Sequence, residues 1–499
     1  MPRYKLQAPL KGWDTTTSLA EQEEGYASLL DNYFPDRQRC TLRKGLLKYA
    51  QIETTDAIES LNPYNTAETF IAGAGGALYN VMTGVKIADG FTNNFWRGAE
   101  YKGQIFLANG FDDAQVYDGN ECKPVEFSGT ENVKFANIAV ANNQVVAVAE
   151  DSLDFYYLPV GNISGELEQF FLSQIAIKGG KLLAVAAFGK DTANGFNKYV
   201  AFITSEGEII IYNTADFGDP TKIEILGNYF TSRPIGRNCV VQWGADIVII
   251  TEDGYKPLSQ IVANGELLKE SNLFSYRISG AVDEAARKYS EDPRWQGVIA
   301  AGENFAMFNV PDDSGNMQHV MNLDTGAWCR FTGIDAQSIC VFGGKLYFGM
   351  NDGVIAQYSG NSMYDNTYIN GHIKNVYSKL GYENYKLLTL FNTRIKSDSP
   401  DLEITFAIGA DYDDANFEFV QVDNAAGFYW ADEDTPETDP DTRYWDEDYW
   451  SGGVTDVSRT YSVSGYGISF SLDIKTSTNN TDIEVYDSWV EFEPANALG

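Results

Sequence analysis

Residues Tyr101 to Gly119 read YKGQIFLANGFDDAQVYDG, and this stretch decides the fold class. Two short segments, Gln104 to Ala108 and Gln115 to Asp118, are rich in β-branched and aromatic residues. The Asn, Gly and Asp residues between them favour a tight turn. The stretch therefore predicts a β-hairpin that ends in an aromatic residue and a glycine.

The same pattern recurs along much of the chain, for example in EGEIIIYNTADFG, ending at Gly218, and in LYFGMNDGVIAQYSG, from Leu346 to Gly360. The aligned positions are 38, 40, 55, 43, 66 and 37 residues apart; they are Tyr79, Tyr117, Tyr157, Tyr212, Tyr255, Met321 and Tyr358. A period near 40 with about four short strands per unit is typical of a β-propeller, whose blades bury their faces against one another. The irregular spacing admits six or seven blades. A β-sandwich or a β-helix also contains such hairpins and is the alternative fold.

The longest unit contains Ala281 to Tyr289, whose Ala, Glu, Arg and Lys residues predict a short helix.

From Leu387 to Pro494 the strand-like segments are longer and alternate apolar with polar residues. That change predicts a separate antiparallel β-sandwich. Residues before the first hairpin have little regular period and predict an extended lead. The expected all-β chain thus has an extended segment at 1–50, a β-propeller at 51–380 and a β-sandwich platform at 381–499.

The net charge of -34 is unevenly distributed along the 499 residues. Residues 1 to 50 carry eight Lys or Arg and six Asp or Glu, so the remainder carries 28 basic and 64 acidic residues. Such an acidic surface repels nucleic acid and anionic membranes over about 8 Å at physiological salt. We therefore expect no specific DNA binding, although an acidic wall lets DNA slide past without adhering.

Residues that carry chemistry are scarce. With only His319 and His372, histidine-dependent catalysis or a histidine-based zinc site is hard to build, and no nucleophile-elbow, zinc-protease, phosphate-loop or dinucleotide motif is present. The five cysteines, Cys40, Cys122, Cys239, Cys329 and Cys340, contain no C-x-x-C and predict buried reduced thiols. We expect no enzymatic activity, no cofactor and no metal.

Neither a long apolar run nor the apolar core of a signal peptide is found in the sequence. The expectation is a protein that is made in a cytoplasm without inserting into a membrane.

Five stretches together resemble a family of tailed-phage virion proteins. They are Gly12 to Asp14 (GWD), Leu30 to Pro35 (LDNYFP), Thr41 to Gly45 (TLRKG), Gln318 to Phe331 (QHVMNLDTGAWCRF) and Leu346 to Gly353 (LYFGMNDG). The family includes the nozzle or tail-hub proteins of short-tailed phages, also called DNA-stabilisation proteins. The resemblance identifies a phage structural family better than a position in the virion.

The resemblance implies a virion protein that forms a homohexameric ring below the connector or adaptor of the phage tail. Such a ring continues and closes the DNA channel and takes part in genome retention and ejection, contacting tail fibres or spikes. On this view the protein is assembled in the host cytoplasm. The residues expected to fasten the subunit to its neighbours are Trp13, Asn32, Tyr33, Phe34, Pro35 and Arg43.

An acidic run from Asp432 to Asp448 is flanked by large aromatic residues, which are Trp430, Tyr444, Trp445, Tyr449 and Trp450. A block of like charges favours a solvated loop, and its spacing does not fit a calcium loop. Aromatic residues beside such a loop suit a partner-contact surface, although burial in the core of the sandwich explains each of them equally well.

Asn322 to Trp328 (NLDTGAW) is similar to the Asp-box turn of sialidase-type propellers, one residue short. The box is a turn device, so it predicts a structural turn and not a glycosidase. The many Tyr and Trp residues nevertheless leave a second function open, a carbohydrate-binding or depolymerising receptor-recognition propeller.

Overall fold

The computed structural model describes residues 1–130, 132–192, 195–214, 216–264, 273–313, 315–397, 401–413, 418–423, 429–430, 442–443 and 455–495. The protein is 53% strand and 8% helix, which confirms an all-β chain built from many small sheets. Two compact units are distinguished. Unit 1 comprises Met1–Leu47, Val320–Gly333 and Ser359–Gly499, and unit 2 comprises Lys48–His319 and Ile334–Tyr358.

These units differ from the boundaries expected from the sequence. The first 47 residues are not a separate lead, since they group with the C-terminal strands, and Val320–Gly333 groups with them as well. Their strands are short and pair with segments hundreds of residues away, for example Arg3 with Glu491. A local pattern cannot reveal such pairings, because strand partners are fixed by tertiary packing.

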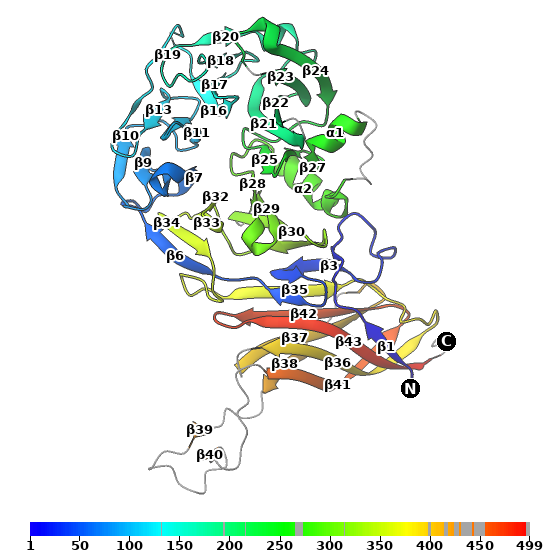
Figure 1. The fold of residues 1–499 in the computed structure, drawn as a ribbon. Helices are drawn as coiled ribbons and strands as arrows, with labels where there is room; N and C mark the ends of the chain where they lie inside the picture. The colour runs from blue at the N-terminus through cyan, green and yellow to red at the C-terminus, as the bar shows by residue number, and fades with distance from the viewer. Residues whose placement is uncertain are drawn as a thin grey trace. The chain divides into compact units, whose positions relative to one another are not determined.

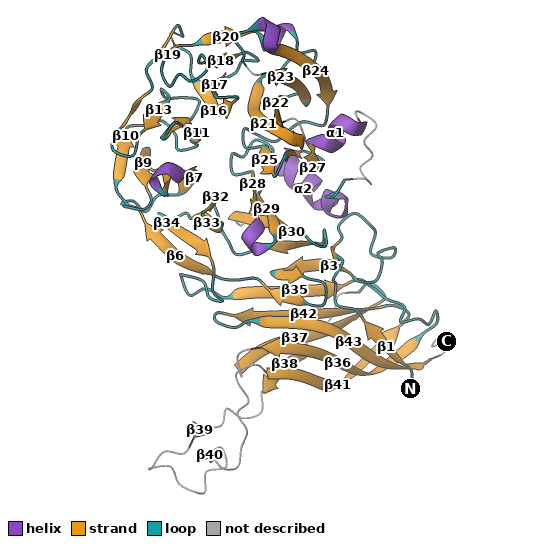
Figure 2. Cartoon of the chain, in the orientation of Figure 1, coloured by secondary structure: helices purple, strands orange, loops and turns teal. Residues whose placement is uncertain are grey.

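Six small sheets of three or four strands, and a three-stranded section (β28 to β30) of a ten-stranded sheet, follow one another along the described part of unit 2 (Figures 1 and 2). The first two contain β7 (Ile58–Tyr64), β8 (Thr69–Ala74), β9 (Ala77–Asn80) and β10 (Lys86–Asp89), and then β11 (Arg97–Tyr101), β12 (Gln104–Ala108), β13 (Gln115–Tyr117) and β14 (Cys122–Pro124). The third and fourth contain β16 (Phe135–Ala141), β17 (Gln144–Ala149), β18 (Phe155–Tyr157) and β20 (Glu168–Phe170), and then β21 (Leu182–Thr192), β22 (Gly195–Thr204), β23 (Glu208–Thr214) and β24 (Ile223–Phe230). The last three contain β25 (Val240–Trp243), β26 (Asp246–Thr251) and β27 (Gly254–Pro257), then β28 (Gln296–Ala300), β29 (Phe305–Asp312) and β30 (Gly315–Asn322), and finally β32 (Ser338–Phe342), β33 (Lys345–Gly349), β34 (Val354–Tyr358) and β6 (Leu46–Gln51).

The sheets of unit 2 close on themselves. One strand of each sheet contacts a strand of the next, in the pairs β7 and β11, β11 and β16, β16 and β21, β21 and β26, β25 and β28, and β28 and β32, and β32 in turn contacts β7. The last sheet takes its outer strand, β6, from a segment that precedes the first sheet in the sequence. The two ends of the ring are therefore joined by hydrogen bonding within a single sheet.

The hairpin predicted at Tyr101 to Gly119 is confirmed, because β12 and β13 pair antiparallel with Phe106 opposite Val116. The side chain of Asn109 holds the turn, accepting hydrogen bonds from the backbone nitrogens of Phe111 (3.1 Å) and Asp112 (2.9 Å). Every aligned position of the repeat lies on the third strand of a successive sheet, namely β9, β13, β18, β23, β27, β30 and β34.

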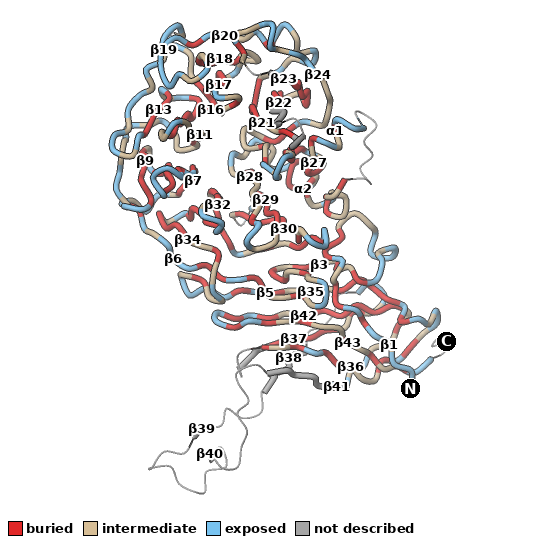
Figure 3. Tube along the Cα trace, viewed as in Figure 1, coloured by how far each residue is buried: buried red, intermediate tan, exposed pale blue. Residues whose placement is uncertain are grey.

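Each hydrophobic cluster of unit 2 combines residues from neighbouring sheets. The buried residues are red in Figure 3. In one of these clusters, Phe155 of β18 stacks on Phe202 of β22 with ring centroids 4.5 Å apart, and both residues are fully buried. Burying one such side chain contributes about 1.5 to 3 kcal/mol. Each sheet therefore depends on its neighbour for a core, as expected of a repeat array.

The described part of unit 2 also contains two α-helices, α1 (Leu258–Asn264) and α2 (Ser279–Tyr289), and a parallel pair of short strands, β15 (Phe127–Ser128) and β19 (Gly165–Glu166). Helix α2 confirms the predicted helix at Ala281 to Tyr289. It buries Val282, Ala285 and Ala286.

Unit 1 contains two larger sheets (Figure 1). One has the order β4 (Tyr33–Pro35), β5 (Cys40–Leu42), β43 (Ile483–Pro494), β36 (Lys386–Ser397) and β41 (Thr455–Gly467), with β1 (Arg3–Leu6) also paired to β43. In the other, the strands of unit 1 have the order β31 (Trp328–Phe331), β2 (Gly12–Trp13), β3 (Tyr26–Asp31), β35 (Ile369–Asn375), β42 (Phe470–Thr478), β37 (Asp401–Ala410) and β38 (Glu418–Asp423). Two further strands, β39 (Tyr429–Trp430) and β40 (Thr442–Arg443), pair with each other.

Side chains of the two sheets of unit 1 meet in a shared core. Phe391 of β36 packs on Phe406 of β37 with ring centroids 5.5 Å apart, and the Tyr33 and Thr476 hydroxyls hydrogen-bond at 2.9 Å. The N-terminal strands β1 to β5 thus lie in the same two sheets as the long C-terminal strands.

All five cysteines are free thiols, and all but Cys122 are buried, as predicted. Burial raises the pKa of Cys122, Cys239 and Cys340 to about 12. Among the described residues, no helix has the length and apolarity that crossing a membrane requires.

Candidate functional site

Four of the five stretches that carry the phage resemblance contribute residues to unit 1, around Asn32. This residue follows β3 with a φ of 59°, a left-handed conformation that asparagine tolerates better than most residues. Its side-chain oxygen accepts hydrogen bonds from Arg43 Nε (2.8 Å) and the backbone nitrogen of Thr332 (2.8 Å). Its nitrogen donates to Thr332 Oγ1 (2.9 Å) and to the carbonyl of Asn370 (2.7 Å). Asn32 therefore joins four separate stretches of the chain.

Arg43 supplies a buried charge to this cluster, with only 3% of the residue exposed. Besides Asn32, its guanidinium donates to the carbonyls of Lys44 (2.9 Å) and Thr332 (3.1 Å). The planar fork of arginine reaches all three acceptors at once, which a lysine ammonium cannot do with the same geometry. The arginine of the third motif therefore serves as a hydrogen-bond donor to backbone carbonyls within its own unit.

A bidentate ion pair lies beside Asn32. Arg330 donates from Nε and Nη2 to the two carboxylate oxygens of Asp31, both at 2.7 Å. The same guanidinium lies 5.3 Å from the ring centre of Trp13, whose Nε1 donates to the carbonyl of Ser28. The Trp of the first motif, the Asp of the second and the Arg of the fourth are therefore in contact.

Gly12 and Asp14 of the first motif have backbone roles. Gly12 has a φ of 93°, and a Cβ there would lie 2.5 Å from the backbone nitrogen of Trp328, so only glycine fits beside β31. Asp14 is buried and accepts from the backbone nitrogens of Thr16 (2.9 Å) and Thr17 (3.2 Å). These contacts fix the path of the chain after β2.

The Asp-box-like segment is a structural turn, as predicted, although Asn322 and not an aspartate holds it. Its Oδ1 accepts from the backbone nitrogens of Asp324 (2.8 Å) and Thr325 (3.2 Å), and its Nδ2 donates to the carbonyl of Pro35 (2.9 Å). Gly326 completes the turn with a φ of 72°, and Trp328 is buried.

The expected fastening residues are held inside their own unit. Trp13, Asn32, Tyr33, Pro35 and Arg43 are buried, and Phe34 is half-buried. Their side chains are used for internal contacts in unit 1, so a fastening role for this set has no support in the structure. The motif marks a folding core, which sequence reasoning alone does not distinguish from an interface, because both use aromatic and arginine side chains.

The predicted partner-contact segment cannot be placed in the same way. Tyr444, Trp445, Tyr449 and Trp450 lie outside the described residues, as does most of Asp432 to Asp448, and of Trp430 only the position on β39 is described.

The two histidines lie in separate structural settings. His319 Nδ1 is 2.9 Å from the Tyr255 hydroxyl in unit 2, whereas His372 Nε2 is 2.6 Å from Asp473 Oδ1 in unit 1. All four residues lie on strands, His319 on β30, Tyr255 on β27, His372 on β35 and Asp473 on β42. Within the described ranges, no three or more His, Cys, Asp or Glu side chains are grouped so as to hold a metal ion.

Unit 2 contains a cavity of about 510 Å³ that sequence reasoning missed. Most of its lining residues lie at or just before the first strands of several sheets. The lining includes Glu59, Phe95, Arg97, Phe111, Leu183 and Asn238. These residues come from separate repeats, so no local spacing reveals them.

Comparisons with known proteins do not identify the chain. No protein-family model and no curated protein matches it. Among solved structures, it is similar to the computationally designed Ika8 protein, with 12% identity, 71% of this chain and 99% of that chain covered, and a TM-score of 0.37. It is also similar to an exo-β-1,3-galactanase from Phanerochaete chrysosporium solved with galactose, with 10% identity, 84% and 100% coverage, and a TM-score of 0.31.

Proposed function

We propose that unit 2 is a seven-bladed β-propeller and that unit 1 is a β-sandwich. The closed series of six small sheets and one three-stranded section of a larger sheet, and the repeat positions on the third strand of each, support the propeller. The strand β6 would close the ring by completing the last blade. The two facing sheets with a shared aromatic core support the sandwich.

On this fold we propose a structural virion protein without enzymatic activity. More particularly, we propose the tail nozzle of a short-tailed phage, a homohexameric ring below the connector that takes part in genome retention and ejection. The observation that carries this proposal is the cluster around Asn32, because four of the five stretches that resemble the phage family contribute to one hydrogen-bonded core. Residues that act together in a fold are stronger support for a family resemblance than scattered matches.

The charge of the chain fits this role. A ring of subunits that each carry a net charge of -34 presents an acidic surface to DNA. The DNA itself carries about one negative charge per 1.7 Å of helix axis. Repulsion would keep the genome from adhering during passage. In this proposal the protein contacts the adaptor ring and the fibres or spikes, and DNA passes without specific recognition.

The proposal is tested by measuring the mass of the full chain by light scattering at several concentrations and two salt levels, followed by electron microscopy. The expected particle is a ring with a mass near six times 55.3 kDa. An antibody against the chain should label the tail end of purified phage particles. A monomer at every concentration that also releases sugar from host-cell polysaccharide would overturn the proposal and favour the receptor-recognition propeller.

A further inference from the structure

Arg97 is unusual among the cations that line the cavity of unit 2. It lies at the start of β11, partly buried, and its Nε donates to the side-chain oxygen of Asn238. Asn238 is itself anchored, because its nitrogen donates to the carbonyl of Pro293 (3.1 Å). Among the described residues, no carboxylate pairs with Arg97 and neither terminal nitrogen has a hydrogen-bond acceptor.

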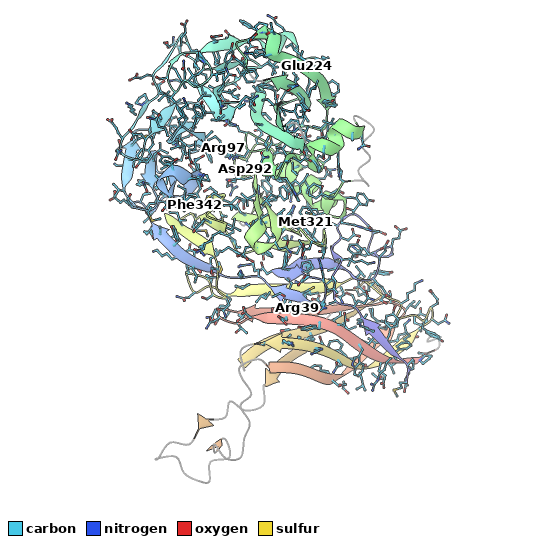
Figure 4. All side chains as sticks on the ribbon, viewed as in Figure 1. Arg39, Arg97, Glu224, Asp292, Met321 and Phe342 are labelled. Atoms are coloured by element: carbon cyan, nitrogen blue, oxygen red, sulfur yellow. The ribbon has the colours of Figure 1, made fainter. Side chains whose placement is uncertain are left out.

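Other charged residues of the cavity have partners of their own. Lys181 pairs with Asp151 (2.8 Å), and Arg237 pairs with Glu150 (3.1 Å). Of the carboxylates, Asp292 is held by Arg294 (2.6 Å) and Glu59 accepts from Asn94 (2.7 Å). In Figure 4 the labels of Arg97 and Asp292 both lie within the ring of sheets.

A partly buried guanidinium without a counter-ion is costly, since arginine loses hydration and gains no ion pair in return. Burial lowers the pKa of Arg97 to about 10, so the side chain is still a cation at neutral pH. Its Nε is held in place by Asn238, which leaves the two terminal nitrogens available as a preorganised fork.

We propose that this cavity binds a small organic carboxylate, whose carboxylate group pairs with the terminal nitrogens of Arg97 and whose apolar part lies against Phe95, Phe111 and Leu183. A volume of about 510 Å³ suits a small molecule. Phe111 is 56% exposed although it lines the cavity, so it offers an apolar wall that the chain itself does not cover.

The acidic residues of the cavity decide between classes of anion. Glu59, Glu291 and Asp292 line the same space, and they would repel a phosphate dianion more strongly than a singly charged carboxylate. A planar carboxylate also matches the arginine fork in a bidentate pair. This inference goes beyond the proposed virion role and is independent of it.

The test is calorimetric titration of the full chain with sodium benzoate, sodium acetate and sodium glucuronate, with uncharged benzamide and inorganic phosphate as comparisons. We expect a carboxylate to bind, benzoate more tightly than acetate, and benzamide and phosphate to bind at least about tenfold more weakly than benzoate. If glucuronate binds more tightly than benzoate, the result would identify the ligand as a sugar acid. No heat from any of the three carboxylates up to about 10 mM would overturn the proposal.

Variants separate the site from general charge effects. Arg97→Gln should weaken benzoate binding at least about tenfold, with Arg97→Lys intermediate, because lysine keeps the charge but not the fork. Phe111→Ala should weaken the binding of benzoate but not that of acetate, because only benzoate has a ring that lies against Phe111. Arg233→Gln is the matched control, since Arg233 is exposed and pairs with Glu206. Benzoate binding unchanged in Arg97→Gln would contradict the proposal.

A second measurement uses the unaltered protein, in case Arg97→Gln does not fold. Phenylglyoxal modifies accessible guanidinium groups, and mass spectrometry locates each modified arginine. Benzoate should slow modification of Arg97 and leave that of Arg233 unchanged. Equal rates at Arg97 with and without benzoate would overturn the proposed contact.

Discussion

Arg43 shows how a single buried charge can organise unit 1. Its guanidinium donates to Asn32, Lys44 and Thr332, which belong to three stretches of the chain. Hydrogen bonds to a charged group are worth about 1.5 to 3 kcal/mol, and their loss leaves buried acceptors unsatisfied. The residue is therefore expected to matter for folding before it matters for any partner.

We predict that Arg43→Ala lowers the free energy of unfolding by about 3 kcal/mol and that Arg43→Lys lowers it by about 2 kcal/mol. Urea unfolding followed by tryptophan fluorescence measures both. Arg37→Ala is the control: Arg37 is exposed and lies 3.6 Å from Asp324, so its removal should change stability by less than about 0.5 kcal/mol. Equal effects at the two positions would contradict the internal role of Arg43.

The thiol of Cys340 gives a pH prediction. Burial raises its pKa to about 12, whereas an unfolded cysteine titrates near about 8.5. Between these values the unfolded chain loses the proton and the folded chain keeps it, so the unfolded state binds fewer protons. The free energy of unfolding should then fall as pH rises, by about 1.4 kcal/mol per pH unit for each such thiol.

The contribution of this thiol to the free energy of unfolding is fully present below about pH 8.5. It is lost progressively as the pH rises from there towards the folded pKa of about 12. Urea unfolding of Cys340→Ala between about pH 8 and pH 11 should show a shallower decline than the unaltered protein. For each protein, the free energy of unfolding at each pH is expressed relative to its own value at neutral pH. This removes the constant loss of stability that the substitution causes by deleting the sulfur atom. Parallel curves would show that the thiol titrates alike in both states.

At the scale of elements, the N-terminal strands form part of unit 1, and β6 belongs to the last sheet of the series in unit 2. Two truncations therefore separate two roles. Removing residues 1–45 takes β1 to β5 out of both sheets of unit 1, whereas removing 1–51 also removes β6.

We predict that the protein lacking 1–45 loses protection from hydrogen exchange in β31 and in the strands β35 to β43, but keeps it in β7 to β30 and in β32 to β34. Further removal of β6 should lower protection in β32 to β34, because their sheet then lacks its outer strand. Hydrogen exchange with mass spectrometry measures both effects. A native exchange pattern in unit 1 after the first truncation would mean that residues 1–45 are a dispensable lead after all.

At the scale of the whole molecule, the surplus of acidic residues opposes the compact state. With a net charge of -34, repulsion between like charges favours expansion, and salt screens it. Calorimetry at about 20 mM and about 500 mM sodium chloride should show a higher Tm at the higher salt. Sucrose at equal osmolality is the control for general solute effects, and a Tm that falls with salt would contradict net repulsion.

The sequence by itself determined the local units of this protein. Asn109, Gly110 and their neighbours dictate a hairpin turn, and the tyrosine on the third strand of every sheet but that of β30, where Met321 stands, marks the repeat, because turn chemistry and two-residue alternation act over a few residues. The helix at Ala281 to Tyr289 and the free, mostly buried cysteines were predictable for the same reason.

Only the tertiary structure decided which distant segments join. The sequence placed residues 1–50 in an extended lead and assigned Asn32 and Arg43 to an interface, yet both residues are buried among strands of unit 1. It also gave no sign of the cavity at Arg97, whose walls come from separate repeats. Contacts between residues hundreds of positions apart depend on the packing of whole sheets, and a local pattern does not contain that information.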